Sequence, residues 1–74
     1  MVVVTVLIRV DAGKVWDVSK EIEKIDGVKS SSVVTGPYDV IALAELPSTE
    51  DLRRLMQSVH DVEGIDRTET CIAL

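Results

Sequence analysis

Thr-Gly-Pro-Tyr-Asp at positions 35–39 lies at the centre of the chain, between two apolar runs. Gly36 accepts a positive φ without steric cost, and Pro37 presets its own φ near the value that a turn needs. A Gly-Pro pair between two strand-like runs therefore predicts a hairpin connection. A hairpin does not require a phenol and a carboxylate after the proline, so Tyr38 and Asp39 are candidate functional residues.

Further secondary structure is predicted on both sides of this turn. β-branched and apolar runs predict strands, and apolar residues at three- and four-residue spacing predict amphipathic helices. In order, the pattern predicts a strand at 2–10, a helix at 14–25, strands at 28–34 and 38–45, a second helix with apolar positions 52, 55, 56 and 59, and a strand at 65–74.

The two halves of the chain repeat each other at an offset of about 37 residues. Ile22 corresponds to Val59, and Gly27, which ends the first helix region, corresponds to Gly64. A βαβ unit written twice predicts one domain over residues 1–74 with the α+β order β-α-β-β-α-β. This is the ferredoxin-like arrangement, a four-stranded antiparallel sheet with two helices on one face.

The first predicted strand is apolar on both of its faces. Only Thr5 and Arg9 interrupt it, whereas a half-solvated antiparallel strand alternates apolar and polar residues. Two helices cover one face of the sheet, so we expect the second face to meet another copy of the chain. A hydrophobic content of 46% in 74 residues also favours an oligomer, because a domain of this size buries only about 60% of its unfolded surface.

Composition argues against several classes of partner. Thirteen Asp and Glu outnumber eight Lys and Arg, for a formal net charge of −5. Nucleic-acid binding needs a basic patch, so we expect no direct contact with DNA or RNA and none with an anionic membrane. The absence of a signal-peptide pattern and the single Cys71 favour a cytoplasmic protein without a disulfide or a cysteine-rich metal site.

Few side chains in this chain have a pattern typical of catalysis. His60 and Cys71 stand alone, with no partner at metal-ligand or triad spacing, so we expect no catalytic group, metal or cofactor. Thr68 and Thr70 lie two residues apart in a predicted strand, which directs both hydroxyls to one face. The pair is either a result of the strand propensity of threonine or a set of hydrogen-bonding groups for a small polar ligand.

Together these features resemble the C-terminal regulatory domain of the Lrp/AsnC transcriptional regulators. The resemblance covers the whole chain and rests on the repeat and three motifs. These motifs are the Gly-Pro-Tyr-Asp corner at 36–39, the Asp-Gly-Val and Glu-Gly-Ile turns at 26–28 and 63–65, and the Thr-Glu-Thr-Cys-Ile-Ala-Leu ending at 68–74.

The resemblance implies a non-enzymatic function in sensing an amino acid effector. Domains of this family pair sheet to sheet as a dimeric α+β barrel, and their dimers form rings, often octamers. Carried over to this chain, Gly36, Tyr38 and Asp39 would line an effector pocket between dimers, with Thr68 and Thr70 contributing. Asp39 would accept hydrogen bonds from the effector's ammonium group.

The sequence departs from typical members of the family because it begins at the first strand, without a helix-turn-helix domain. The resemblance is thus to a stand-alone form, which would act through hetero-assembly with full-length Lrp/AsnC regulators.

Two alternatives remain open at this point. One is a small dimeric α+β barrel enzyme, of the cofactor-free oxygenase or isomerase type, which would need His60 or Asp39 to face an enclosed apolar cavity. The other is a purely structural oligomerisation module.

Overall fold

The computed structural model describes residues 1–74 and contains four strands and two helices in the predicted order. The elements are β1 (Val2–Val10), α1 (Val15–Glu23), β2 (Val28–Val33), β3 (Val40–Leu46), α2 (Asp51–His60) and β4 (Ile65–Ile72). The predicted bounds differ from these by two residues or fewer at most ends, because helix ends fray and the turn residues 34–39 join neither strand.

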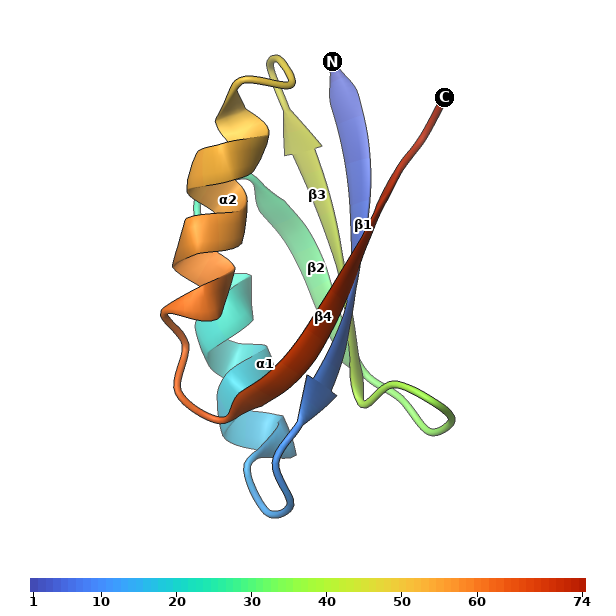
Figure 1. Cartoon of the computed structure of the whole chain (residues 1–74), viewed down its shortest axis with the longest axis vertical. Helices are drawn as coiled ribbons and strands as arrows, with labels where there is room; N and C mark the ends of the chain where they lie inside the picture. Colours follow the sequence, from blue (N-terminus) through green and yellow to red (C-terminus); the bar gives the residue numbers. More distant parts are fainter.

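The four strands form one antiparallel sheet in the order β2-β3-β1-β4. Both helices lie against the same face, and the opposite face is open (Figure 1). The prediction of a ferredoxin-like α+β fold is therefore confirmed. Neither helix has the length and apolar character needed to cross a membrane.

The core lies between the helices and the inner face of the two central strands. Every second residue of β1 and of β3 points into it, including Val6 and Ala42, which pair directly across the two strands. The buried apolar residues are Val4, Val6, Ile8, Val10, Val18, Ile22, Val40, Ala42, Ala44, Leu46, Leu55 and Val59.

The outer face of the sheet remains partly apolar and uncovered within one chain. Val3 on β1 and Leu43 on β3 are each 37% exposed, and Leu7 is half-buried on the same face. The apolar character of β1 thus arises from a buried inner face and an open outer face that is still rich in valine and leucine.

The internal repeat is visible in the hydrogen bonds that join the two halves. After α1, the carbonyl of Gly27 accepts a bond from Glu45 N at 2.9 Å, and after α2 the carbonyl of Gly64 accepts one from Asp11 N at 2.8 Å. Each glycine turn is therefore tied to the end of a central strand, β3 in one half and β1 in the other.

The start of α2 shows one half of a capping box. The carboxylate of Asp51 accepts bonds from both the backbone N–H and the hydroxyl of Ser48, each at 3.3 Å. The Ser48 hydroxyl does not bond to a backbone N–H of the helix, and α2 has no side-chain cap at its N-terminus.

Candidate functional site

The Gly-Pro-Tyr-Asp turn joins β2 to β3 and projects from the end of the sheet opposite the two termini (Figure 1). The bond from Val34 N to the carbonyl of Asp39, 2.9 Å long, closes its base. Gly36 has φ of +121°, a value that side chains other than hydrogen rarely allow. A Cβ atom at Gly36 would meet nothing within 4 Å, so this edge of the turn is open to solvent.

Asp39 is fixed to β1 through both its backbone and its side chain. Its backbone N–H donates to the carbonyl of Ile8, and its Oδ2 accepts from Val10 N, each at 2.9 Å. The carboxylate therefore continues the β1–β3 ladder one step beyond the first residue of β3. The side chain is 29% exposed, and Oδ1 makes no hydrogen bond within the chain.

Arg9 is a second member of this corner that sequence reasoning did not assign to the site. Its Nη1 donates to the carbonyl of Pro37 at 2.8 Å, and its Nε lies 4.0 Å from Oδ2 of Asp39. The contact holds the turn against β1 from a position 28 residues away in the sequence. The only available signal was an arginine interrupting an otherwise apolar strand.

Tyr38 lies beside Arg67 and Glu69 of β4, which pair with Arg9 and Leu7 of β1 on the open face of the sheet. The pKa of its phenol is raised, first because the neighbouring carboxylate of Glu69 can accept a hydrogen bond from the protonated phenol and then because of partial desolvation. The guanidinium of Arg67 acts in the opposite direction by favouring the phenolate.

Thr68 and Thr70 point to the other side of the sheet. They pair across β4 and β1 with Ile8 and Val6, which are buried under the helices. The hydroxyl of Thr68 lies 3.1 Å from Nε2 of His60, and the hydroxyl of Thr70 donates to Sδ of Met56 at 3.3 Å.

The five predicted site residues therefore fall into two groups within one chain. Gly36, Tyr38 and Asp39 form a corner that reaches the open face, whereas Thr68 and Thr70 border α2 on the helix face. Each group is well defined, but the sheet separates them.

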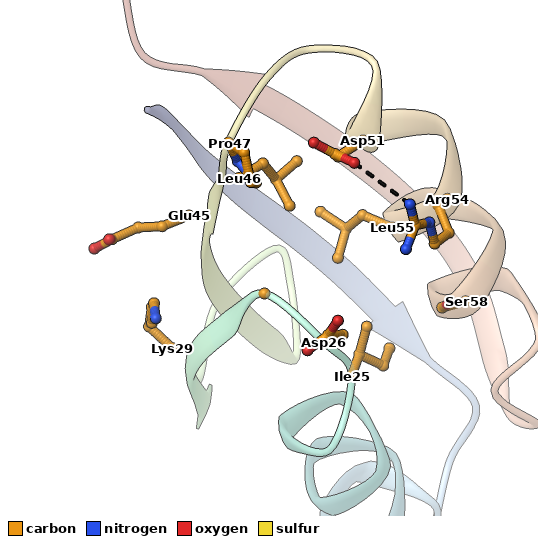
Figure 2. Close-up of a pocket in the computed structure, with 11 residues that line it drawn as sticks. Ile25, Asp26, Lys29, Glu45, Leu46, Pro47, Asp51, Arg54, Leu55 and Ser58 are labelled. Carbon is orange, nitrogen blue, oxygen red and sulfur yellow. Dashed lines mark ion pairs between the residues drawn. The ribbon is translucent and has the colours of Figure 1, made fainter.

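A surface hollow lies elsewhere, between the α1–β2 turn and the first half of α2. It has a volume of about 360 Å³, and its walls combine Leu46 and Leu55 with charged groups, among them the ion pair of Arg54 with Asp51 at 3.5 Å (Figure 2). It contains none of the predicted site residues.

His60 and Asp39, the two residues that an enzyme would need, do not face an enclosed cavity. No hollow of the surface includes His60 or Asp39, and one carboxylate oxygen of Asp39 is already bonded to the backbone. No three His, Cys, Asp or Glu side chains gather as a metal-binding group.

Comparison with known proteins places the fold in a regulatory family. The family model of the Lrp/AsnC ligand binding domain matches residues 3–74. An uncharacterised HTH-type transcriptional regulator of Pyrococcus furiosus is 34% identical over 67 residues, which are 90% of this chain and 45% of that protein. The chain thus spans about half the length of the curated relatives that it matches.

Solved structures agree with this assignment. A protein from Thermus thermophilus, known from a crystal structure, has 36% sequence identity to this chain. The two structures align with a TM-score of 0.95, and the match covers 100% of this chain and 94% of that one. A feast or famine regulatory protein from Mycobacterium tuberculosis, in complex with L-methionine, is 25% identical with a TM-score of 0.83 and covers 100% of this chain and 50% of that one.

The chain has the fold and motifs of a regulatory, ligand-binding type of domain. It belongs to the Lrp/AsnC ligand binding domain family.

Proposed function

We propose that this protein is a non-enzymatic module of transcriptional regulation that binds an amino acid and self-assembles. It acts in the cytoplasm through full-length Lrp/AsnC regulators, with which it co-assembles, rather than by contacting DNA itself. A formal net charge of −5 supports the absence of direct DNA contact, since phosphate binding requires clustered cations. The match of residues 3–74 to the ligand binding domain carries the proposal.

The effector site is built from two chains. The turn corner with Tyr38 and Asp39 forms one wall, and Thr68 and Thr70 of a neighbouring chain form the other. The separation of the two groups by the sheet supports this arrangement, because a ligand that contacts both groups would contact them in different copies of the chain. Oδ1 of Asp39 remains available for the ammonium group of the effector.

Assembly proceeds in two steps. Dimers form through the open, partly apolar face of the sheet, and dimers then join into a ring, with an octamer as the expected size. Ligand binding shifts the population of these assemblies, which requires a higher affinity for one of them.

Two variants of Asp39 separate its role in folding from its role in binding. Asp39→Asn keeps an oxygen acceptor for Val10 N but removes the charge, whereas Asp39→Ala removes both. Asp39→Asn should remain folded and lose at least tenfold in affinity for the amino acid that binds the unaltered protein. Asp39→Ala should also lose stability, by about 1–2 kcal/mol for a part-buried bond to a charged acceptor.

The measurement is isothermal titration calorimetry against the twenty amino acids, with urea unfolding of each variant at one protein concentration. Equal affinity for the responding amino acid in Asp39→Asn and the unaltered protein would exclude the assigned role of the carboxylate.

A purely structural oligomerisation module is the alternative, because the bond of Asp39 to Val10 N already accounts for a carboxylate at this turn. An oligomer that persists while no amino acid produces heat or a thermal shift would establish that alternative instead.

A further inference from the structure

The two helices leave a groove between them on the side away from the sheet. The hollow of about 360 Å³ described above reaches from the α1–β2 turn to the first half of α2, and a second hollow of about 500 Å³ continues between α1 and the end of α2. Ile25 and Ser58 line both hollows, so the two form one continuous depression, which we call the interhelical groove. Figure 2 shows Ile25 at the α1–β2 turn and Ser58 on α2, on facing sides of the first hollow.

The groove has an apolar floor and charged walls. Leu55 on the floor is buried, and Ile25 and Val62 are half-buried and pack against the core. Seven carboxylates and three cations line the walls. The groove is therefore suited to a ligand that combines hydrocarbon surface with positive charge.

Only part of the negative charge of the walls is neutralised within the chain. Three of the seven carboxylates form ion pairs with a lysine or an arginine, at 2.9–3.5 Å. The other four carboxylates form no ion pair, and only one cation of the groove is likewise unpaired. The unpaired carboxylates are Asp17, Asp26, Glu45 and Asp61, and the unpaired cation is Lys29.

The groove is separate from the surfaces that the proposed function uses. Ser58 and Asp61, three residues apart, lie on the groove side of α2. Met56 and His60 contact β4 on the other side of the same helix. The open face of the sheet is turned away from both helices (Figure 1). Pairing of copies through that face therefore leaves the groove accessible.

We propose that the interhelical groove docks a lysine- and arginine-rich segment of a partner protein. The stems of these side chains are hydrocarbon and pack along apolar surface, while their charged heads reach carboxylates or water. Ile25, Leu55 and Val62 receive the stems, and the unpaired carboxylates of both walls receive the heads. Docking of this kind does not depend on amino acid binding.

The spacing of the carboxylates favours an extended polycation over a single cation. No three of them gather closely enough to hold a metal ion, so their charge is spread along the groove. The groove follows α2, whose 10 residues span about 15 Å at 1.5 Å per residue. An extended peptide covers that length with about five residues. A short basic segment is therefore long enough to contact both hollows.

The experiment is a fluorescence anisotropy titration of the full chain with a labelled, blocked decapeptide of alternating lysine and alanine. The alternation places all lysines on one side of an extended chain. Physiological ionic strength suppresses attraction between exposed charges more than about 8 Å apart. The peptide should bind, and the same peptide with glutamate in place of lysine should not.

A second peptide tests the apolar floor. Replacing each lysine by 2,4-diaminobutyrate keeps the positive charge and shortens every stem by two methylene groups. This peptide should bind about tenfold more weakly, which is the effect of two buried methylene groups. Equal affinity of the two peptides would show attraction by charge alone and would overturn docking in the groove.

Two double variants test the walls with the same change in net charge. Asp17→Asn with Asp61→Asn removes one unpaired carboxylate from each side of the groove, and neither side chain makes an ion pair or hydrogen bond that folding would lose. This variant should bind the lysine peptide at least tenfold more weakly. Glu50→Gln with Asp66→Asn removes two exposed carboxylates outside the groove and should leave the affinity unchanged.

Amide chemical shifts in ¹⁵N-labelled protein locate the bound peptide. The amides of α1 and α2 should move, and those of Thr5 and Leu43 on the open face should not. Absence of binding, equal affinity of the two double variants, or shifts confined to the open face would each overturn the proposal. The amino acid response of the unaltered protein is measured separately, so these outcomes leave the proposed function intact.

Discussion

Single side chains at the turn serve the fold as well as the proposed site. The bond from Val10 N to Asp39 gives the last N–H of β1 a partner beyond the final β1–β3 pair, which is Ile8 with Val40. Arg9 adds a bond to the carbonyl of Pro37, which has no N–H of its own to join the ladder. These bonds fix Asp39 and Arg9 in the free protein. A ligand that binds at this turn therefore does not lose binding free energy in ordering the two side chains.

Tyr38 permits a direct test of the corner because it is the only tyrosine of the chain. Its pKa lies above the ordinary value of 10.0, mainly because of Glu69. Ultraviolet titration of the phenol should therefore show ionisation at higher pH than in a free tyrosine, and Glu69→Gln should lower that pKa toward 10.0. Arg67→Gln should raise it further, since Arg67 favours the phenolate.

The raised pKa of Tyr38 makes the stability of the folded protein depend on pH. A phenol whose pKa is raised by folding stabilises the folded protein below the unfolded pKa, and the contribution is lost as the pH rises through the folded pKa. The loss therefore occurs in alkaline solution, above about pH 10. A Tyr38 pKa that does not change in Glu69→Gln would contradict the assigned contact.

At the scale of elements, the turn after α2 depends on a close approach of backbone to α1. Gly64 has φ of +101°, and a Cβ atom there would lie 2.9 Å from Cδ and 3.3 Å from Cβ of Lys14, and 3.3 Å from Cγ2 of Val18. The carbonyl of the same glycine binds Asp11 N at the end of β1. A side chain would therefore disturb the joint between the two halves.

Two alanine substitutions separate backbone strain from this steric contact. Gly36→Ala introduces strain alone, because its Cβ meets nothing within 4 Å, and should cost about 1–2 kcal/mol. Gly64→Ala adds displacement of Lys14 and Val18 and should cost about 1 kcal/mol more. Urea unfolding at one protein concentration measures both, and equal losses would show that Lys14 moves aside without cost.

At the scale of the whole molecule, the open face of the sheet is the surface through which we expect copies to pair. Leu43 lies near its centre on β3, opposite Thr5 of β1, and is 37% exposed. A carboxylate introduced there would be buried without a partner in a face-to-face dimer, at a cost of several kcal/mol.

Leu43→Glu should therefore shift the protein from an oligomer to the 8.1 kDa monomer in size-exclusion chromatography with light scattering. Gln57→Glu, on the exposed surface of α2, adds the same charge and should leave the mass unchanged. A monomeric unaltered protein, or an oligomer of unchanged mass in Leu43→Glu, would contradict pairing through this face.

Much of the fold followed from local patterns. The β-branched run at Val2–Val10, the helical spacing of Ile22 and Val59 with their neighbours, and a glycine after each helix specify elements through contacts between residues close in sequence. The repeat then predicted the topology, because two equal βαβ units have few ways to share one sheet. The sequence also predicted the Gly-Pro-Tyr-Asp turn, and it indicated Tyr38 and Asp39 as candidate functional residues because a turn does not require them.

What the tertiary structure alone decided is which face each side chain occupies and what it contacts. In a sheet a shift of one residue in register sends every side chain to the opposite face, and the spacing of Thr68 and Thr70 does not contain that register. Pairing of Thr68 with Ile8 directs the threonines to His60 and Met56, away from Tyr38. Local sequence therefore determined the elements and the turn, whereas strand register, set by contacts between distant residues, divided the candidate site into two walls.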